Sequence, residues 1–245
     1  MLAVRDVAVS GSRSLHAIRF PLGSLSVFIG ANGVGKTNLY RALECLQSAA
    51  TDTLIRNLVA EGSLDSVSWA GARKVHESAR SRWSVELADD VSGLAYDYAV
   101  EVGCKPPAAA AGFPLEPELK TERLRRILAR RPATLLHRHG PGGFLRDGEG
   151  RKRSLGGDLL PSETVLGTVQ DGGGYPDLHP DLLAPLARLI VKASARTQVW
   201  LVTHSERLAD AILAEGGTRP HRVIRREGAT WIEGLKLFGA FAEDD

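Results

Sequence analysis

The first thirty residues alternate apolar and polar side chains in the manner of β-strands. The alternation runs through residues 2–9, the chain turns at Gly11, and the pattern resumes over 18–20. We expect an antiparallel pair of strands here. The next apolar run, 25–29, is short, rich in β-forming residues and bounded by glycines. It predicts a buried strand that leads into a loop at 30–37.

The hydrophobic period changes directly after that loop. Leu39, Ala42, Leu43 and Leu46 fall at helical spacing. This pattern predicts an amphipathic helix that begins where the loop ends. The loop therefore joins a strand to the N-terminus of a helix.

Paired β-rich runs separated by turn residues predict hairpins further along the chain. A segment at 118–130 instead places apolar side chains on one side and arginines on the other, and Pro132 ends it. That pattern predicts a basic amphipathic helix. The expected hairpins are 83–87 with 94–102, 134–137 with 143–146, and 222–225 with 229–233.

The last third of the chain combines helical and strand patterns. Apolar positions at helical spacing over 179–194 predict a core helix, and the apolar run 199–203 predicts a strand. Ser205 is suited to cap a helix that stops at Gly216-Gly217. A second strand-loop-helix unit is therefore expected here.

Composition places the chain among ordinary globular proteins. Hydrophobic residues make up 43% and charged residues 24% of its 245 residues, which speaks against disorder or a fibrous repeat. The first residues contain no apolar stretch long enough for a secretion signal or a membrane span. Because no such stretch is found and only Cys45 and Cys104 are present, we expect a reducing, cytoplasmic setting and no membrane partner.

Charge is distributed unevenly along the chain. The net charge of the whole chain is +2, too small to indicate a nucleic-acid or membrane partner by itself. Residues 120–153 nevertheless carry eleven lysines and arginines against three acidic residues, a local net charge of +8. This excess predicts contact with a DNA backbone. A basic helix face that is only solvated explains the same residues, and this alternative stays open.

The loop at 30–37 reads Gly-Ala-Asn-Gly-Val-Gly-Lys-Thr, which is the Walker A pattern of nucleotide-binding loops. Its glycines let backbone amides approach phosphate oxygens at the N-terminus of the following helix. Lys36 is expected to reach the β and γ phosphates of ATP, and the Thr37 hydroxyl to bind Mg²⁺. The residues expected to bind the nucleotide are Gly30, Asn32, Gly33, Gly35, Lys36, Thr37 and Asn38.

Short segments near both ends of the chain carry a family resemblance. Near the N-terminus they are Ser-Arg-Ser-Leu at 12–15, Pro-Leu-Gly at 21–23, and the loop with its preceding strand. Near the C-terminus they are Leu-His-Pro at 178–180 and Val-Thr-His-Ser at 202–205. These segments resemble RecF-like and SMC-like ABC-type ATPases, often called AAA family ATPases.

The resemblance implies a fold, a set of partners and one further site residue. The fold would be α/β, a P-loop NTPase of the ABC/RecF-like type with a mixed sheet and flanking helices. His204 would be the switch histidine that hydrogen-bonds the γ phosphate. The chain would hydrolyse ATP, form an ATP-dependent homodimer and act on DNA in repair, maintenance or defence.

A linker rich in proline and small residues at 105–114 divides the chain. Together with the resemblance, it predicts three parts. Residues 1–104 form an N-terminal P-loop lobe with antiparallel hairpins, and 105–177 form an inserted β-hairpin and basic helical lobe with an irregular segment. Residues 178–245 form a C-terminal ATPase lobe with the switch histidine.

Two motifs of this family are missing from the sequence. We find neither the signature loop nor the strand ending in Asp-Glu that holds Mg²⁺ and positions water. The family's spacing would put these carboxylates at Gly172 and Gly173, one place from Asp171. Asp171 is therefore the candidate for a displaced catalytic carboxylate, while a glycine-rich turn explains the same residues. We also expect that a segment was lost between residues 171 and 179.

Three functions follow as hypotheses. The leading one is a RecF-like ATPase that acts on DNA. The second is a non-hydrolysing nucleotide-binding or DNA-binding remnant, which the missing carboxylates favour. The third is a small-molecule kinase, because a Walker A loop alone does not select the phosphate acceptor.

Overall fold

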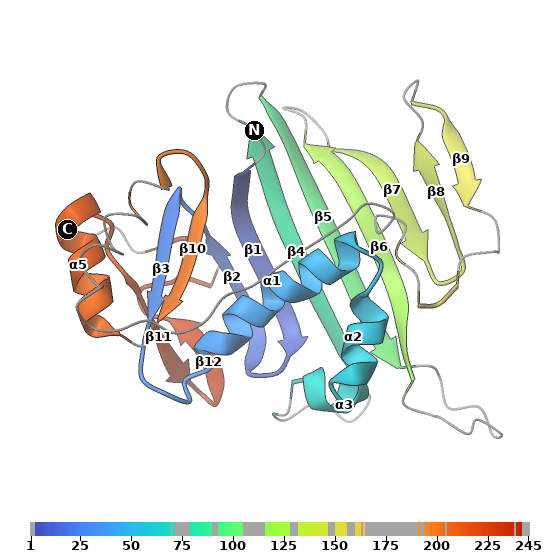
Figure 1. Ribbon diagram of the computed structural model, residues 1–245. Helices are drawn as coiled ribbons and strands as arrows, with labels where there is room; N and C mark the ends of the chain where they lie inside the picture. The colour runs from blue at the N-terminus through green and yellow to red at the C-terminus, as the bar shows by residue number, and fades with distance from the viewer. Residues whose placement is uncertain are drawn as a thin grey trace.

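The computed structural model of this chain contains two β-sheets with helices packed on them (Figure 1). Within the described residues, one sheet has eight strands and the other has four. The structure describes residues 3–69, 71, 79–89, 93–104, 116–127, 132–146, 150–155, 160–162, 164, 191, 194–203, 205–237 and 239–241.

The larger sheet is antiparallel throughout, with the order β2-β1-β4-β5-β6-β7-β8-β9. Most neighbours in this order are also neighbours in sequence, so short connections build most of the sheet. Its strands are β1 (Ala3–Ser12), β2 (Leu15–Pro21), β4 (Arg80–Asp89), β5 (Leu94–Cys104), β6 (Pro117–Ile127), β7 (Ala133–His139), β8 (Gly142–Arg146) and β9 (Lys152–Leu155).

The smaller sheet has the order β10-β3-β11-β12 and contains the parallel strand pairs of the described residues. Its central strand β3 (Leu25–Ile29) pairs in parallel with β10 (Val199–Thr203) on one side and β11 (His221–Arg226) on the other. The fourth strand, β12 (Ala229–Ile232), pairs with β11 as an antiparallel hairpin. The predicted mixture of parallel and antiparallel strands is thus present.

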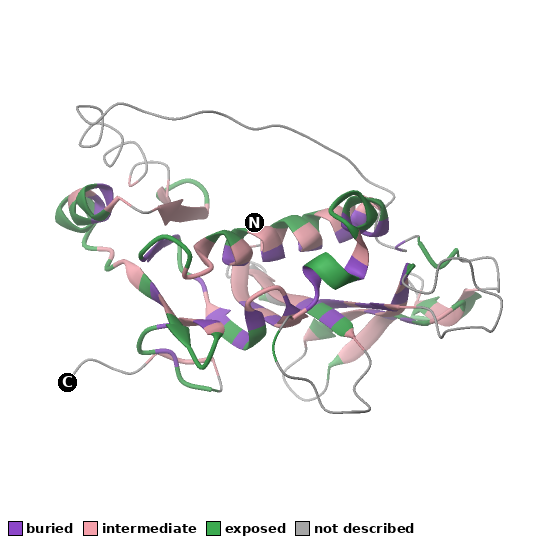
Figure 2. Cartoon of the chain, turned by 90° about the horizontal axis from the view of Figure 1, so that it is seen from below, coloured by how far each residue is buried: buried purple, intermediate pink, exposed green. Residues whose placement is uncertain are grey.

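The longest helix in the described part of the chain, α1, crosses one face of the larger sheet (Figure 1). Its buried residues Leu39, Ala42, Leu46 and Ala49 recur every three or four positions and form a single stripe. Figure 2 shows the buried side of α1 toward the sheet and the exposed side away from it. The helices are α1 (Lys36–Ala50), α2 (Leu54–Ala60), α3 (Ser63–Val67) and α5 (Glu206–Gly216).

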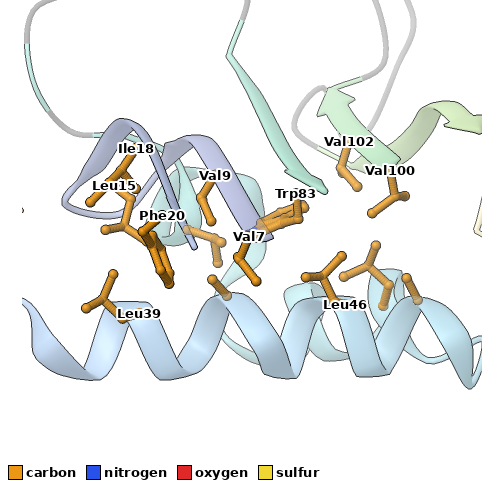
Figure 3. Close-up of a cluster of buried hydrophobic side chains, with 14 of the residues drawn as sticks. Val7, Val9, Leu15, Ile18, Phe20, Leu39, Leu46, Trp83, Val100 and Val102 are labelled. Carbon is orange, nitrogen blue, oxygen red and sulfur yellow. The ribbon is translucent and has the colours of Figure 1, made fainter. Parts of the chain in front are cut away.

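The main hydrophobic core lies between α1 and the larger sheet. Figure 3 shows Leu39 and Leu46 of α1 facing strand residues that include Val7 and Trp83. Each of these side chains is fully or almost fully buried. Burying a large apolar side chain stabilises a fold by about 1.5–3 kcal/mol, so this contact fixes α1 on the sheet.

A second core explains why β3 is apolar at nearly every position. Leu25, Val27 and Ile29 pack against α5, while Phe28 points into the main core. All five residues of β3 are buried, as expected for a parallel strand covered on both faces. The loop that follows β3 therefore starts from a rigid support.

Several sequence predictions are confirmed. The three expected hairpins correspond to β4 with β5, β7 with β8, and β11 with β12. Ser205 caps α5 by accepting a hydrogen bond from the backbone amide of Leu208, and Gly217 ends the helix with φ of 67°. The strand expected at 199–203 is β10.

Two sequence predictions are wrong. The first turn lies at Arg13 and Ser14, while Gly11 belongs to β1. Gly11 is required for another reason: its φ is +69°, and a Cβ atom there would lie 2.1 Å from the carbonyl oxygen of Arg80 in β4. The basic helix expected at 118–130 is strand β6 over its described part.

The helical pattern of 118–130 arises from a bulge in β6. Thr121 pairs with Glu101 and Leu119 with Val102, so Lys120 is an extra residue between the two pairs. This insertion shifts the alternation of buried and exposed side chains and removes the strand signal. Hydrogen bonding to β5 and β7 on both edges then outweighs the helical propensity of the arginines.

Two other sequence predictions concern the helix at 179–194 and the domain boundary near residue 105. The expected helix lies outside the described residues, apart from Val191 and Ser194. The larger sheet continues from β5 into β6, across the boundary expected near residue 105. No helix in the described part of the chain is long and apolar enough to cross a membrane.

Candidate phosphate-binding site

The Walker A loop connects the buried strand β3 to the N-terminus of α1. Gly33 and Gly35 in this loop have φ of 80° and 96°, in the left-handed region that side chains other than glycine rarely adopt. Gly35 is also the N-cap residue of α1. The positions of these glycines in the motif therefore match the backbone that the loop adopts.

The N-terminus of α1 carries the features of an anion site. Its cap residue forms no side-chain hydrogen bond to the helix, and its first turn contains no acidic residue. The first amides of a helix have no partner within the helix, and the helix dipole adds about half a positive charge at this end. A bound phosphate would supply the partner that the protein side chains do not.

Lys36 lies across the same loop. Its Nζ atom donates to the carbonyl oxygens of Gly30 and Ala31, the latter at 2.7 Å. Desolvation lowers the pKa of Lys36 from its ordinary value. A phosphate oxygen would offer this ammonium group a charge-assisted bond in place of a neutral carbonyl.

A cavity of about 420 Å³ opens beside the loop. This size lies within the usual range of ligand pockets, roughly 300–1,000 Å³. Thr203 lines the cavity from β10, where it pairs with Ile29 at the end of β3. The residues that line it are Asn32, Gly33, Gly35, Lys36, Thr37, Asn38, Val202 and Thr203.

The structure thus brings together most of the residues expected at the site. Six of the seven predicted nucleotide-binding residues line the cavity, and Gly30 opens the loop that encloses it. The two predicted catalytic residues, His204 and Asp171, lie outside the described residues. Thr203, which directly precedes His204 in the sequence, lines the cavity at the end of β10.

The donor set suits a magnesium ion only together with a nucleotide. Thr37 is exposed at the cavity and could offer its hydroxyl oxygen. Within the described ranges, no three His, Cys, Asp or Glu side chains gather to hold a metal. Mg²⁺ in nucleotide sites is usually held by one or two protein groups, phosphate oxygens and water, so Thr37 fits that role.

Sequence reasoning missed a row of polar side chains on the outer side of the loop. The Nδ2 atom of Asn38 donates to Oγ of Ser14 at 2.6 Å, and that Oγ lies 2.5 Å from Oγ1 of Thr230. Thr230 donates to the carbonyl oxygen of Val34 at 2.9 Å, and Arg225 donates to that of Gly33 at 3.3 Å. A single threonine in a strand pattern gives no signal in the sequence, and Ser14 was noted only as part of a family segment.

The basic region at 120–153 is partly neutralised by its neighbours. Arg123 and Arg125 of β6 both pair with Asp97 of β5, at 3.4 and 2.9 Å, and Lys120 pairs with Glu118. Arg138 is completely buried. The basic side chains of this region that are exposed within the described residues are Arg126, Arg151, Lys152 and Arg153.

Neither the protein-family models nor the curated proteins that were searched contain a match to this chain.

Proposed function

We propose that this chain binds Mg-ATP in the loop at 30–37 and belongs to the RecF-like ABC-type ATPases. The observation that carries the proposal is the glycine loop itself, which leads from a buried parallel strand into a helix with an uncapped N-terminus. The adjoining cavity of about 420 Å³ supports it, because it is lined by six of the expected residues. Such a site favours a phosphate chain over a neutral ligand.

The proposal gives a role to each of the main residues expected at the site. The amides of the loop and of the first turn of α1 hydrogen-bond the phosphates, and Lys36 neutralises the β and γ phosphates. Thr37 joins phosphate oxygens in holding Mg²⁺, which supplies charge neutralisation when the nucleotide is bound. His204, directly after Thr203, would act at the γ phosphate as the family resemblance implies.

A non-hydrolysing nucleotide-binding protein is the second candidate. The sequence shows no strand ending in paired carboxylates, and Gly172 and Gly173 stand where the family's spacing would put them. Positioning of the attacking water is then left without its usual group. The kinase alternative has no comparable support from the described residues.

DNA is the partner that we propose for the basic region. The exposed run Arg151–Arg153 lies at β9, the edge strand of the larger sheet farthest from the nucleotide loop (Figure 1), and the exposed Arg126 lies on β6. A protein that neutralises phosphates with such groups releases counterions, so its affinity falls with salt. Double reversal, Arg126→Glu with Arg153→Glu, should flatten the slope of log affinity against log salt, whereas Arg56→Glu should not.

Radiolabelled Mg-ATP, with and without DNA, tests the proposal. Phosphate release that DNA stimulates would identify an ATPase, and binding without release would identify the non-hydrolysing protein. Transfer of the label to a small acceptor would identify a kinase. Lack of any binding would contradict the proposal. In the assay without DNA, Lys152→Ala, which replaces an exposed lysine of β9, is the control for the loss of ATP binding expected in Lys36→Ala.

A further inference from the structure

We propose that the β11–β12 hairpin acts as a clamp that holds the Walker A loop in its phosphate-binding shape, with Thr230 and Arg225 as positioning residues. Both side chains donate to carbonyl oxygens of the loop, Thr230 to Val34 and Arg225 to Gly33. Neither residue belongs to the loop motif, and they lie almost two hundred positions from it in sequence. The part of this inference that concerns ligand affinity rests on the proposed ATP binding.

The geometry of the peptide bond gives these two hydrogen bonds a consequence for the ligand. In a trans peptide, the carbonyl of one residue and the amide of the next point in opposite directions. When Gly33 and Val34 direct their carbonyls toward the hairpin, the amides of Val34 and Gly35 are directed away from it. Gly33 and Gly35 line the cavity, so the clamp aims these two amide donors at the position of a phosphate.

Only one assignment of donors and acceptors fits the hydroxyl groups of the clamp. A threonine hydroxyl has one hydrogen, and Thr230 uses it on the carbonyl of Val34. Ser14 must therefore be the donor in its 2.5 Å contact with Thr230, and Asn38 is the donor to Ser14. These hydrogen bonds run from Asn38 in the first turn of α1 through Ser14 in the β1–β2 turn to Thr230 in the hairpin, and the last one ends on the loop.

Close packing leaves the loop little freedom on this side. A Cβ atom on Gly35 would lie 1.9 Å from Oγ1 of Thr230 and 2.6 Å from Oγ of Ser14. A Cβ atom on Gly30 would lie 2.4 Å from the carbonyl oxygen of Val223 in β11. The hairpin is itself tied to the β1–β2 turn, because the amide of Thr230 donates to the carbonyl of Ser14 at 2.7 Å.

The test uses variants that remove or keep the hydroxyl group at position 230. Thr230→Val keeps the shape and removes the donor, Thr230→Ser keeps the donor, and Thr121→Val is a strand threonine of β6 distant from the loop. The order parameters of the Val34 and Gly35 amides, measured by nitrogen-15 relaxation without nucleotide, report the clamp directly. Isothermal titration with Mg-ATP reports its effect on binding.

We expect the Val34 and Gly35 order parameters to fall in Thr230→Val from about 0.85, typical of rigid backbone, toward 0.6. The dissociation constant of Mg-ATP should rise about ten-fold, because the carbonyl of Val34 loses its donor and the loop amides lose their direction. Thr230→Ser should restore both values, and Thr121→Val should change neither. Unchanged order parameters in Thr230→Val would overturn the clamp.

Two further outcomes are possible: the wild type does not bind Mg-ATP, or Thr230→Val does not fold. If the wild-type chain does not bind Mg-ATP while Thr230→Val still loosens the loop, the clamp stands and the proposed function fails. If Thr230→Val does not fold, Arg225→Gln takes its place, because Arg225 is exposed and Gln is too short to maintain its contact with Gly33. Order parameters that stay at the wild-type level in a folded Arg225→Gln would then refute the clamp.

Discussion

Alanine substitution at Gly33 and Gly35 should separate backbone strain from packing within the Walker A loop. Both residues have positive φ, so alanine at either position costs about 1–2 kcal/mol in backbone strain. Nothing lies within 4 Å of the position that a Cβ atom would take on Gly33. On Gly35 the same atom would meet Thr230 and Ser14 at 1.9 and 2.6 Å.

The collision at Gly35 adds an overpacking cost of about 1–3 kcal/mol to the strain. Gly33→Ala should therefore destabilise the protein by about 1–2 kcal/mol, and Gly35→Ala by about 2–5 kcal/mol. Urea unfolding at constant m-value measures both differences. Equal destabilisation by the two substitutions would refute the packing of the hairpin against the loop.

Three further predictions concern catalysis, helix capping and pH. The purified chain should bind Mg-ATP but hydrolyse it very slowly, and an ordinary turnover rate that falls in Asp171→Asn would show that Asp171 supplies the carboxylate. Ser205→Ala removes the cap bond to the amide of Leu208 and should lower the free energy of unfolding by about 1 kcal/mol, measured by urea titration. The ring of His221 stacks on that of Phe241, with 4.2 Å between the ring centroids. Burial lowers the pKa of His221, so the neutral imidazole is favoured in the folded state. The stability that His221 contributes is therefore present above its ordinary pKa of 6.5 and is lost as the pH falls below that value. Between pH 7 and 5, the melting temperature of His221→Gln should fall less than that of the wild type.

The sequence predicted those parts of the fold in which local patterns agree with the final packing. The apolar run of β3, the helical spacing of Leu39 and Leu46, and the Ser205 cap each describe an element that is stable for local reasons. The loop was predictable for the same reason, because Gly33 and Gly35 are required by the backbone angles of the loop itself. At these positions the local sequence preference and the tertiary packing favour the same structure.

Other parts depend on contacts between distant residues and could not be read from the pattern. Strand β6 looks helical because the bulge at Lys120 breaks its alternation, and only its pairing with β5 and β7 decides its structure. The role of Gly11 depends on the carbonyl of Arg80, and the contact of Thr230 with Val34 joins residues 196 positions apart. Long-range pairing overrides local preference at such positions.

The most direct test of the account is isothermal titration of the wild-type chain, Lys36→Ala and the control Lys152→Ala with Mg-ATP. The account predicts saturable binding to the wild type and to Lys152→Ala, with no measurable binding to Lys36→Ala, because only Lys36 directs a positive side chain across the loop carbonyls of Gly30 and Ala31 in the described structure. Equal affinity of the wild type and Lys36→Ala, or no binding to the wild type, would contradict the assignment of the loop as a nucleotide site.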